Sequence, residues 1–309
     1  MRVVGLLRAG EIVALPTETV YGLAADAFNP VAVAKIFEAK ERPRFDPLIV
    51  HLPTREALND VATADTQLVA QLIDRFWPGP LTIILPTRKR IPDIVTAGLE
   101  TVALRMSANP FFAEIATRLA RPLAAPSANR FGHISPTAAS HVLDELDGRI
   151  PLIVDGGSAQ HGLESTIVRI INDQIEILRR GPITAEMLQE FAPITERNSG
   201  NTIVAPGQLR SHYAPRTKLI LVNRLDDFSA PFGKRIGALH FASPRKAGQF
   251  SITRRLSERA DLREAAANLF GMLRELDTEN LDFIVAELLP EQGLGAAINE
   301  RLRRAATTR

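Results

Sequence analysis

The chain has 309 residues, of which 45% are hydrophobic and 23% are charged, as in a soluble globular protein with a sizeable core. Its formal net charge is +2, which permits a local basic site but does not require a nucleic-acid partner. It contains no cysteine, which excludes disulfides, thiolate catalysis and cysteine-ligated zinc. No apolar run is long enough to span a membrane and the N-terminus lacks a signal peptide's apolar core, so we expect a cytoplasmic protein without a membrane partner.

Short apolar runs alternate with helical patterns along the chain, which predicts an α/β fold. Asn29-Pro30 marks one helix start, because asparagine caps a first turn and proline fits the first helical position. The predicted helices of the first two thirds are residues 2–8, 31–39, 66–76, 111–119, 136–146 and 184–191, and the predicted strands are residues 12–15, 48–51, 81–85, 101–105, 123–125 and 152–154.

Two alternating runs, residues 163–170 and 174–181, are separated by a short Asn-Asp turn, which is typical of a β-hairpin. Ser165 and Arg179 lie at opposite ends of this segment. Because the ends of an antiparallel pair are neighbours, we expect both side chains to face one cleft.

The length of the chain favours two domains. Residues 192–215 are rich in proline, glycine, serine and asparagine, which predicts a linker, although its histidine and Tyr213 are unusual in a plain tether. Beyond it, strands are predicted at residues 219–222, 236–241 and 283–288, and helices at residues 262–276 and 293–306, which indicates a small Rossmann-like domain. We therefore expect a first domain over residues 1–191, a linker or lid over residues 192–215 and a second domain over residues 216–309.

The stretch from Lys40 to His51 places three cations, Lys40, Arg42 and Arg44, between a predicted helix and a buried strand. Charged groups near a core cost free energy unless they are paired, and lysine and arginine on a turn are common phosphate ligands. This stretch alone is equally consistent with a solvated basic turn.

Two further polar stretches follow predicted strands, where α/β proteins bind their ligands. Residues 16–26 include two threonines, a glutamate and Tyr21. The alternative to a ligand-binding role for this stretch is a polar turn with the tyrosine packed in the core. Residues 126–137 include Ser127 and Ser135; small hydroxyls and backbone N–H groups at a helix start favour anions, although an ordinary cap and loop explain them equally well. Neither a P-loop nor a Gly-x-Gly-x-x-Gly motif occurs.

Taken in order, the stretches PTETVYGL, KERPRFDPLIVH, TVALR, APSANRFGHISPT, LESTIV and LRRGPI resemble the YrdC-like domain of threonylcarbamoyl-AMP synthases. PGQLRSHYAP and GLGAAINERLRRAA resemble the longer, two-domain form of that family. The resemblance implies a catalytic domain built on a twisted mixed sheet with a concave basic cleft. It implies the condensation of L-threonine, bicarbonate and ATP to threonylcarbamoyl-AMP and pyrophosphate, with the product passed to a tRNA threonylcarbamoyltransferase complex.

The resemblance also implies roles for individual residues. Lys40 and Arg42 would be the catalytic cations, and Tyr213 would lie across the cleft as a lid. The residues expected to contact ATP are Lys40, Arg42, Asp46, Thr101, Ser127, Asn129, Ser135, Arg179 and Tyr213. The residues expected to hold threonine or its carbamate are Thr19, His51, Arg105, Ser165 and the backbone of Ala125. Mg²⁺ is expected with the ATP phosphates, and no residue is assigned to it.

Several positions depart from the family pattern. Asp46 stands where the family usually has asparagine, which brings a negative charge near the phosphates. Ser107 and Asn109 replace a proline and a histidine, and Arg169 follows a strand where aspartate is frequent.

Two other functions fit parts of the sequence. A non-catalytic RNA- or nucleotide-binding module of the same fold is one, although the near-neutral charge and the 6% aromatic content argue against base stacking on single strands. The other is the chemistry of hydrogenase-maturation carbamoyltransferases, which share the domain but carry cysteine-based zinc fingers that this chain lacks. Whether tRNA is bound directly stays open.

Overall fold

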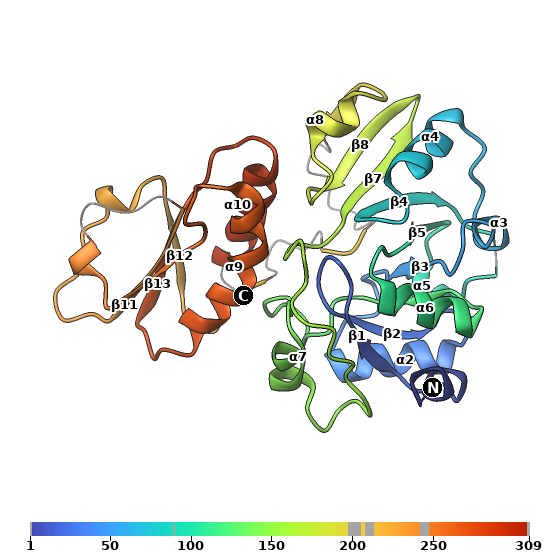
Figure 1. Ribbon diagram of the computed structural model, residues 1–309, viewed down its shortest axis with the longest axis horizontal. Coiled ribbons are helices and arrows are strands. Elements are labelled where there is room, and N and C mark those ends of the chain that lie inside the picture. Colours follow the sequence, from blue (N-terminus) through green and yellow to red (C-terminus); the bar gives the residue numbers. More distant parts are fainter. Residues whose placement is uncertain (1, 89, 197–204, 208–212, 242–246, 308–309) are drawn as a thin grey trace. The chain divides into compact units, whose positions relative to one another are not determined.

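The computed structural model describes residues 2–88, 90–196, 205–207, 213–241 and 247–307, and the chain divides into two compact units (Figure 1). The first unit comprises Met1–Phe131, Pro136–Ala159 and Glu164–Leu209. The second comprises Gly132–Ser135, Gln160–Leu163 and Arg210–Arg309, so it includes two short segments that lie between parts of the first unit in the sequence. No helix among the described residues is long and apolar enough to cross a membrane.

The first unit is built on a nine-stranded mixed sheet in the order β1-β2-β6-β3-β5-β4-β7-β8-β9. Its strands are β1 (Val13–Leu15), β2 (Gly22–Asp26), β3 (Ile49–His51), β4 (Leu81–Pro86), β5 (Thr101–Arg105), β6 (Leu123–Ala124), β7 (Thr166–Ile171), β8 (Gln174–Arg179) and β9 (Ile194–Glu196). Its helices are α1 (Arg2–Arg8), α2 (Pro30–Lys40), α3 (Leu58–Val61), α4 (Gln67–Phe76), α5 (Asp93–Thr96), α6 (Pro110–Leu119), α7 (Ala139–Leu146) and α8 (Ala185–Gln189). The pairs β3–β5, β4–β7 and β8–β9 are parallel and the others are antiparallel.

The two faces of this sheet are covered differently. The main core lies on one face, where α2, α4 and α7 pack on residues such as Val50 and Leu104. Because side chains alternate along a strand, the neighbours Ile49 and Ala103 point to the opposite face. On that face α1 and α6 cover the end formed by β1, β2 and β6. The strands beyond it carry what we call the sheet-face cluster, which consists of Ile49, Ile84, Ala103, Ile167, Leu178 and Ala205.

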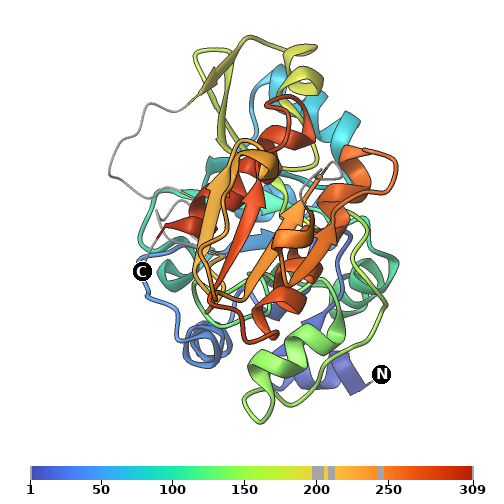
Figure 2. The ribbon, with the colours of Figure 1, turned by 90° about the vertical axis from the view of Figure 1, so that its left-hand side faces the viewer.

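The second unit contains a four-stranded parallel sheet in the order β10-β13-β11-β12, and Figure 2 shows strands of this sheet side by side. Its elements are β10 (Leu219–Val222), η1 (Leu225–Asp227), β11 (Ile236–His240), η2 (Ala247–Gln249), β12 (Ile252–Arg255), α9 (Leu262–Asp277), β13 (Phe283–Glu287) and α10 (Leu294–Ala306). Strands alternating with helices around a parallel sheet were predicted for this part of the chain, and β12 was not.

Most predicted elements of the first unit are present, and the differences have local causes. The helix predicted from residue 136 begins only at Ala139, because the carbonyls of Pro136 and Thr137 accept hydrogen bonds from other segments. The strand predicted at residues 152–154 is a single bridge to β1. The sequence analysis missed β2, whose sequence GLAAD has no β-branched residue to indicate a strand. It also missed β9, which lies within the predicted linker.

Candidate active site

Lys40 joins two of the predicted site stretches. It ends α2, whose first turn is capped by the Asn29 side chain, and it is only 1% exposed. Its Nζ donates hydrogen bonds of 2.5 Å to the carbonyls of Ser127 and Asn129, and its own carbonyl accepts from Phe131 N. Burial, and then the charge of Arg42, lower the pKa of Lys40 well below its usual value. The first cation of the predicted site therefore organises the downstream loop.

Arg42 and Asp46 form a buried ion pair. The Arg42 Nη2 lies 2.9 Å from an Asp46 carboxylate oxygen, and both side chains are at most 4% exposed. Arg42 also donates to the carbonyls of Asp46 and Pro47. Burial raises the pKa of Asp46, and the charges of Arg42, Lys40 and Arg179 oppose this increase. The third cation of the stretch, Arg44, is exposed.

Arg105 forms a second buried ion pair, with Glu18. One guanidinium nitrogen lies 2.6 Å from a Glu18 oxygen, a second donates to Thr19 Oγ1 at 3.0 Å, and Nε donates to a backbone carbonyl. The Ser107 hydroxyl donates to the other Glu18 oxygen at 2.5 Å. Burial would raise the pKa of Glu18, but Arg105 and Ser107 lower it to about 2. Thr19 and Arg105, both predicted to hold threonine, are therefore in contact.

His51 lies beside Arg105 in the sheet, since these two residues are register partners of β3 and β5. The imidazole is buried, packs on Phe112 with 4.7 Å between ring centroids, and is hydrogen-bonded to the backbone of Ala125. Burial, and then the charge of Arg105, lower the pKa of His51 to about 3. The ring is therefore neutral at physiological pH. Its Nδ1 has no hydrogen-bond partner among the described residues.

Ser165 and Arg179 are neighbours, as the hairpin pattern predicted. Arg179 donates to the Ser165 carbonyl through Nε and Nη2, and to the Ser165 hydroxyl at 3.0 Å. The Ser165 hydroxyl also shares a 2.7 Å hydrogen bond with Thr82 of β4. The hairpin turn has both residues at positive φ, Asn172 and Asp173, which matches the two-residue turns that favour such residues.

Strand alternation brings several of these residues to one face of the sheet. His51 is two residues from Ile49, and Arg105 is two residues from Ala103, so each points to the face of the sheet-face cluster. Thr101, which is partly exposed, lies on the same side for the same reason. Ala205, from the segment predicted as a linker, is buried in this cluster. Ala205 therefore packs on the face that carries the candidate site.

Two predicted residues belong to the second unit. Ser135 is buried, and it precedes the first residue of α7 by four positions, so the prediction that it opens a helix was wrong, and its contact with ATP stays a prediction. Tyr213 is 1% exposed; its ring stacks on Phe270 with 5.4 Å between centroids, and the Arg301 guanidinium lies 5.2 Å from the ring centre. Its neighbour His212 lies outside the described residues.

Two contacts at the site were missed by the sequence analysis. Glu18 was noted only as part of a polar stretch, although a buried glutamate next to Thr19 needs a cation. Thr82 lies in a strand whose other residues are apolar, so the sequence pattern indicates only a buried strand. Two departures from the family pattern also have structural roles, because Ser107 bonds Glu18 and Asn109 caps α6. Tyr21 is a core residue, with its hydroxyl donating to a backbone carbonyl.

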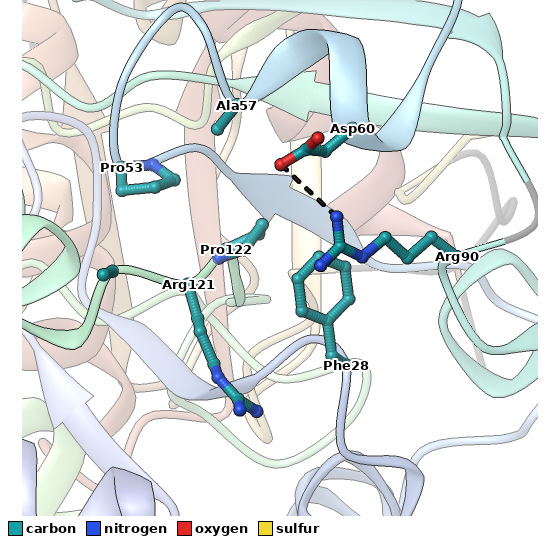
Figure 3. A pocket seen from close by; sticks show the side chains of 8 residues that line it. Phe28, Pro53, Ala57, Asp60, Arg90, Arg121 and Pro122 are labelled. Carbon is teal, nitrogen blue, oxygen red and sulfur yellow. Dashed lines mark ion pairs between the residues drawn. The ribbon is translucent and has the colours of Figure 1, made fainter.

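A pocket of about 350 Å³ lies elsewhere in the first unit (Figure 3). In it the Arg90 guanidinium lies 4.9 Å from the ring centre of Phe28 and 3.4 Å from an Asp60 oxygen. The pocket is lined by Phe28, Pro53, Ala57, Asp60, Arg90, Ala120, Arg121 and Pro122. None of the predicted site residues is among them.

Comparison with known proteins covers the whole chain. Residues 5–181 match a family model described as Telomere recombination, and residues 183–307 match one described as Threonylcarbamoyl-AMP synthase, C-terminal domain. A threonylcarbamoyl-AMP synthase of Bacillus subtilis is 41% identical over 97% of this chain and 91% of the relative. The crystal structure of P. abyssi Sua5 complexed with L-threonine is 37% identical with a TM-score of 0.87, and covers 99% of this chain and 93% of that chain.

A second structure of P. abyssi Sua5, in which a histidine and the tyrosine after it are replaced by alanine, has a TM-score of 0.90 at 36% identity, and covers 99% of this chain and 92% of that chain. The two family models match consecutive parts of the chain, and these relatives are matched along more than nine-tenths of their length. The chain therefore belongs to the two-domain threonylcarbamoyl-AMP synthases, the enzymes that serve threonylcarbamoyladenosine modification of tRNA.

Proposed function

We propose that the face of the nine-stranded sheet bearing the sheet-face cluster binds ATP and L-threonine side by side. The observation that carries the proposal is the pair of hydrogen bonds from Lys40 Nζ to the carbonyls of Ser127 and Asn129. These bonds join the Lys-x-Arg stretch to the Ser-x-Asn stretch, which are far apart in the sequence. One ligand with several phosphates can then meet both.

In this proposal the nucleotide half of the site comprises Lys40, Arg42, Thr101, Ser127, Asn129 and Arg179, with Asp46 beside the phosphates as the partner of Arg42. Ser135 stays a prediction from the family resemblance. Fixed cations and hydroxyls that point at developing negative charge are the strongest catalytic device available to a site without a covalent nucleophile. Ser127 supports this role, because it is partly exposed and its hydroxyl makes no hydrogen bond to the described residues.

The threonine half comprises Thr19, His51, Arg105, Ser165 and the backbone of Ala125. The relative crystallised with L-threonine supports a threonine site in this fold. A neutral imidazole accepts a hydrogen bond, so Nδ1 of His51 suits the substrate amine. Arg105 suits the carboxylate through its planar guanidinium, and Glu18 and Thr19 hold that guanidinium in place.

The reaction then needs positioning more than acid or base chemistry. Threonine gains CO₂ on its amine to form a carbamate, and a carbamate oxygen bonds to the α-phosphorus of ATP. The bond from that phosphorus to the bridging oxygen breaks, and pyrophosphate leaves with the electron pair. Lys40 and Arg42 stabilise the charge on the transferring and leaving phosphates.

Mg²⁺ is proposed to bind together with ATP and without a site of its own on the protein. Among the described residues, no group of three or more histidine, aspartate or glutamate side chains is arranged to hold a metal ion. The carboxylate nearest the cations, that of Asp46, is paired with Arg42. The residues therefore fit a metal held mainly by the ATP phosphates, whose charge it would neutralise.

The linker segment is proposed to cover the reacting groups, since a carbamate decomposes in water. Ala205 within the sheet-face cluster supports this placement. The chain contains one His-Tyr pair, His212-Tyr213, and a structure of the relative was solved with a His-Tyr pair replaced by alanine. The role of Tyr213 as a lid stays a prediction from the family resemblance. The product of the enzyme is expected to pass to a tRNA threonylcarbamoyltransferase complex.

The test is pyrophosphate release from ATP, Mg²⁺ and bicarbonate with and without L-threonine. We expect release that depends on threonine, and a roughly hundredfold to thousandfold lower rate for Ser127→Ala, by analogy with removing one preorganised donor. Ser140→Ala is the matched control, because Ser140 is exposed on α7. Pyrophosphate release without threonine dependence would contradict the function, and equal rates for both variants would contradict the placement of the nucleotide.

A further inference from the structure

Asp46 is an incompletely satisfied buried carboxylate. The residue is 1% exposed, and neither carboxylate oxygen accepts a hydrogen bond from the described residues. Its close partner is the Arg42 guanidinium, at 2.9 Å. Buried carboxylates are normally hydrogen-bonded, and leaving one without hydrogen bonds costs free energy. This arrangement therefore needs a reason other than the stability of the fold.

The surroundings of Asp46 supply that reason. Lys40, Arg42 and Arg179 are each at most 8% exposed, and all three act on Asp46 through their charge. Buried cations without an anion destabilise a protein. The charges that act on Asp46 are all positive, and its carboxylate lies 2.9 Å from Arg42, so it offsets the charge of that guanidinium when no ligand is bound.

The same cations are those proposed to meet the phosphates of ATP. A phosphate oxygen that approaches the Arg42 guanidinium meets the Asp46 carboxylate, which is already paired with it. The phosphate and the carboxylate are both negative, so they repel each other. Since the Asp46 oxygens accept no hydrogen bonds, moving this carboxylate away breaks one ion pair and no hydrogen-bond network.

We propose that the Asp46 carboxylate is a built-in counter-ion of Arg42. It occupies the guanidinium in the empty site and is displaced by the polyphosphate chain of the nucleotide. Asp46 then sets the ATP affinity of this chain below that of the same chain with a neutral residue. This inference rests on the proposed nucleotide site and concerns its regulation. It makes Asp46 a residue that tunes affinity and neither a ligand of ATP nor a catalytic group.

The test compares wild type with Asp46→Asn, which keeps the shape and removes the charge. The probes are inorganic tripolyphosphate and ATP, each without threonine or bicarbonate, and the readouts are the thermal unfolding midpoint and the dissociation constant. We expect Asp46→Asn to bind tripolyphosphate roughly tenfold more tightly than wild type, and so to show a larger midpoint rise on binding. In the synthase assay the KM for ATP should fall while the KM for threonine stays.

The matched control is Asp26→Asn. Asp26 is also buried and paired with an arginine, Arg121, at 2.7 Å, but it lies outside the proposed site. This variant should lower the midpoint equally with and without tripolyphosphate. An unchanged or weaker tripolyphosphate affinity in Asp46→Asn would overturn the inference, because it would make Asp46 a ligand or a packing residue.

If Asp46→Asn does not fold alone, Asp46→Ser provides a second comparison. Recovery of cooperative unfolding by either variant on addition of tripolyphosphate would support the counter-ion role. Failure of both variants to fold, with and without tripolyphosphate, would overturn it. Tripolyphosphate binding is measured without the reaction. If wild type binds tripolyphosphate but releases no threonine-dependent pyrophosphate, the proposed function is contradicted. The comparison of tripolyphosphate affinity between wild type and Asp46→Asn would still be valid.

Discussion

Two buried arginine–carboxylate pairs lie in the same unit and are built in opposite ways. In the pair of Arg105 and Glu18, further donors and acceptors complete the hydrogen bonds around both charges, including the Ser107 hydroxyl. In the pair of Arg42 and Asp46, the carboxylate oxygens accept no hydrogen bond from the described residues. The first pair is a complete hydrogen-bonded network that positions side chains, and the second is an ion pair whose carboxylate lacks hydrogen bonds.

The largest expected effect comes from removing the arginine of each pair. Arg105→Ala leaves Glu18 buried without its counter-ion, and we expect the free energy of unfolding to fall by about 3–5 kcal/mol. Arg42→Ala should cost less than about 2 kcal/mol, because Lys40 and Arg179 still balance Asp46.

The measurement is urea unfolding followed by fluorescence of the single tryptophan, Trp77, which is buried in the first unit. Both variants lie in that unit, so each serves as the control for the other. Equal losses would show that the two pairs do not differ as described.

The stability of the protein should change with pH in opposite directions for the two carboxylates. The folded pKa of Glu18, about 2, lies below its usual 4.5, so its contribution is present above pH 4.5 and is lost as the pH falls toward 2. The folded pKa of Asp46 lies above its usual 3.8. The Asp46 carboxyl therefore stays protonated to a higher pH in the folded state than in the unfolded state. Its contribution to stability decreases as the pH rises through its folded pKa.

The check is the stability difference between wild type and each amide variant, Glu18→Gln and Asp46→Asn, from about pH 6 to about pH 3. On lowering the pH, wild type should lose stability relative to Glu18→Gln and gain it relative to Asp46→Asn. The groups that act on Glu18 are Arg105 and Ser107, and the charge of Glu18 in turn acts to raise the pKa of His51. Those that act on Asp46 are Lys40, Arg42 and Arg179. Two profiles of the same sign would contradict the contrast.

Ser107→Ala should have a smaller effect on stability than Arg105→Ala. This change removes one hydrogen bond to the charged Glu18, which should cost about 1.5–3 kcal/mol. The pKa of Glu18 should rise toward its usual value, since Ser107 is one of the groups that lower it. Unfolding curves at neutral and acidic pH measure both effects, and Ser140→Ala on the exposed face of α7 is the control. A pH profile unchanged from wild type would show that Ser107 is only a packing residue.

Local patterns predicted the parts of the fold that depend on neighbours in sequence. The hairpin of β7 and β8 followed from alternation and its turn residues, and with it the contact of Ser165 with Arg179. The start of α2 followed from its asparagine cap. The alternative of a non-catalytic RNA-binding module was wrong, since full-length relatives are threonylcarbamoyl-AMP synthases. Residue roles at the site stay predictions.

The amino-acid sequence by itself determined the alternation of strands and helices, the family and the candidate residues, because these depend on periodicity and on ordered motifs. Only the tertiary structure decided which charges meet. Glu18 and Arg105 are 87 positions apart, and their pairing depends on the order of strands in the sheet, which no local pattern encodes. The incomplete hydrogen bonding of Asp46 likewise depends on what surrounds it in space. A counter-ion of a nucleotide site and a structural acid look the same in a sequence.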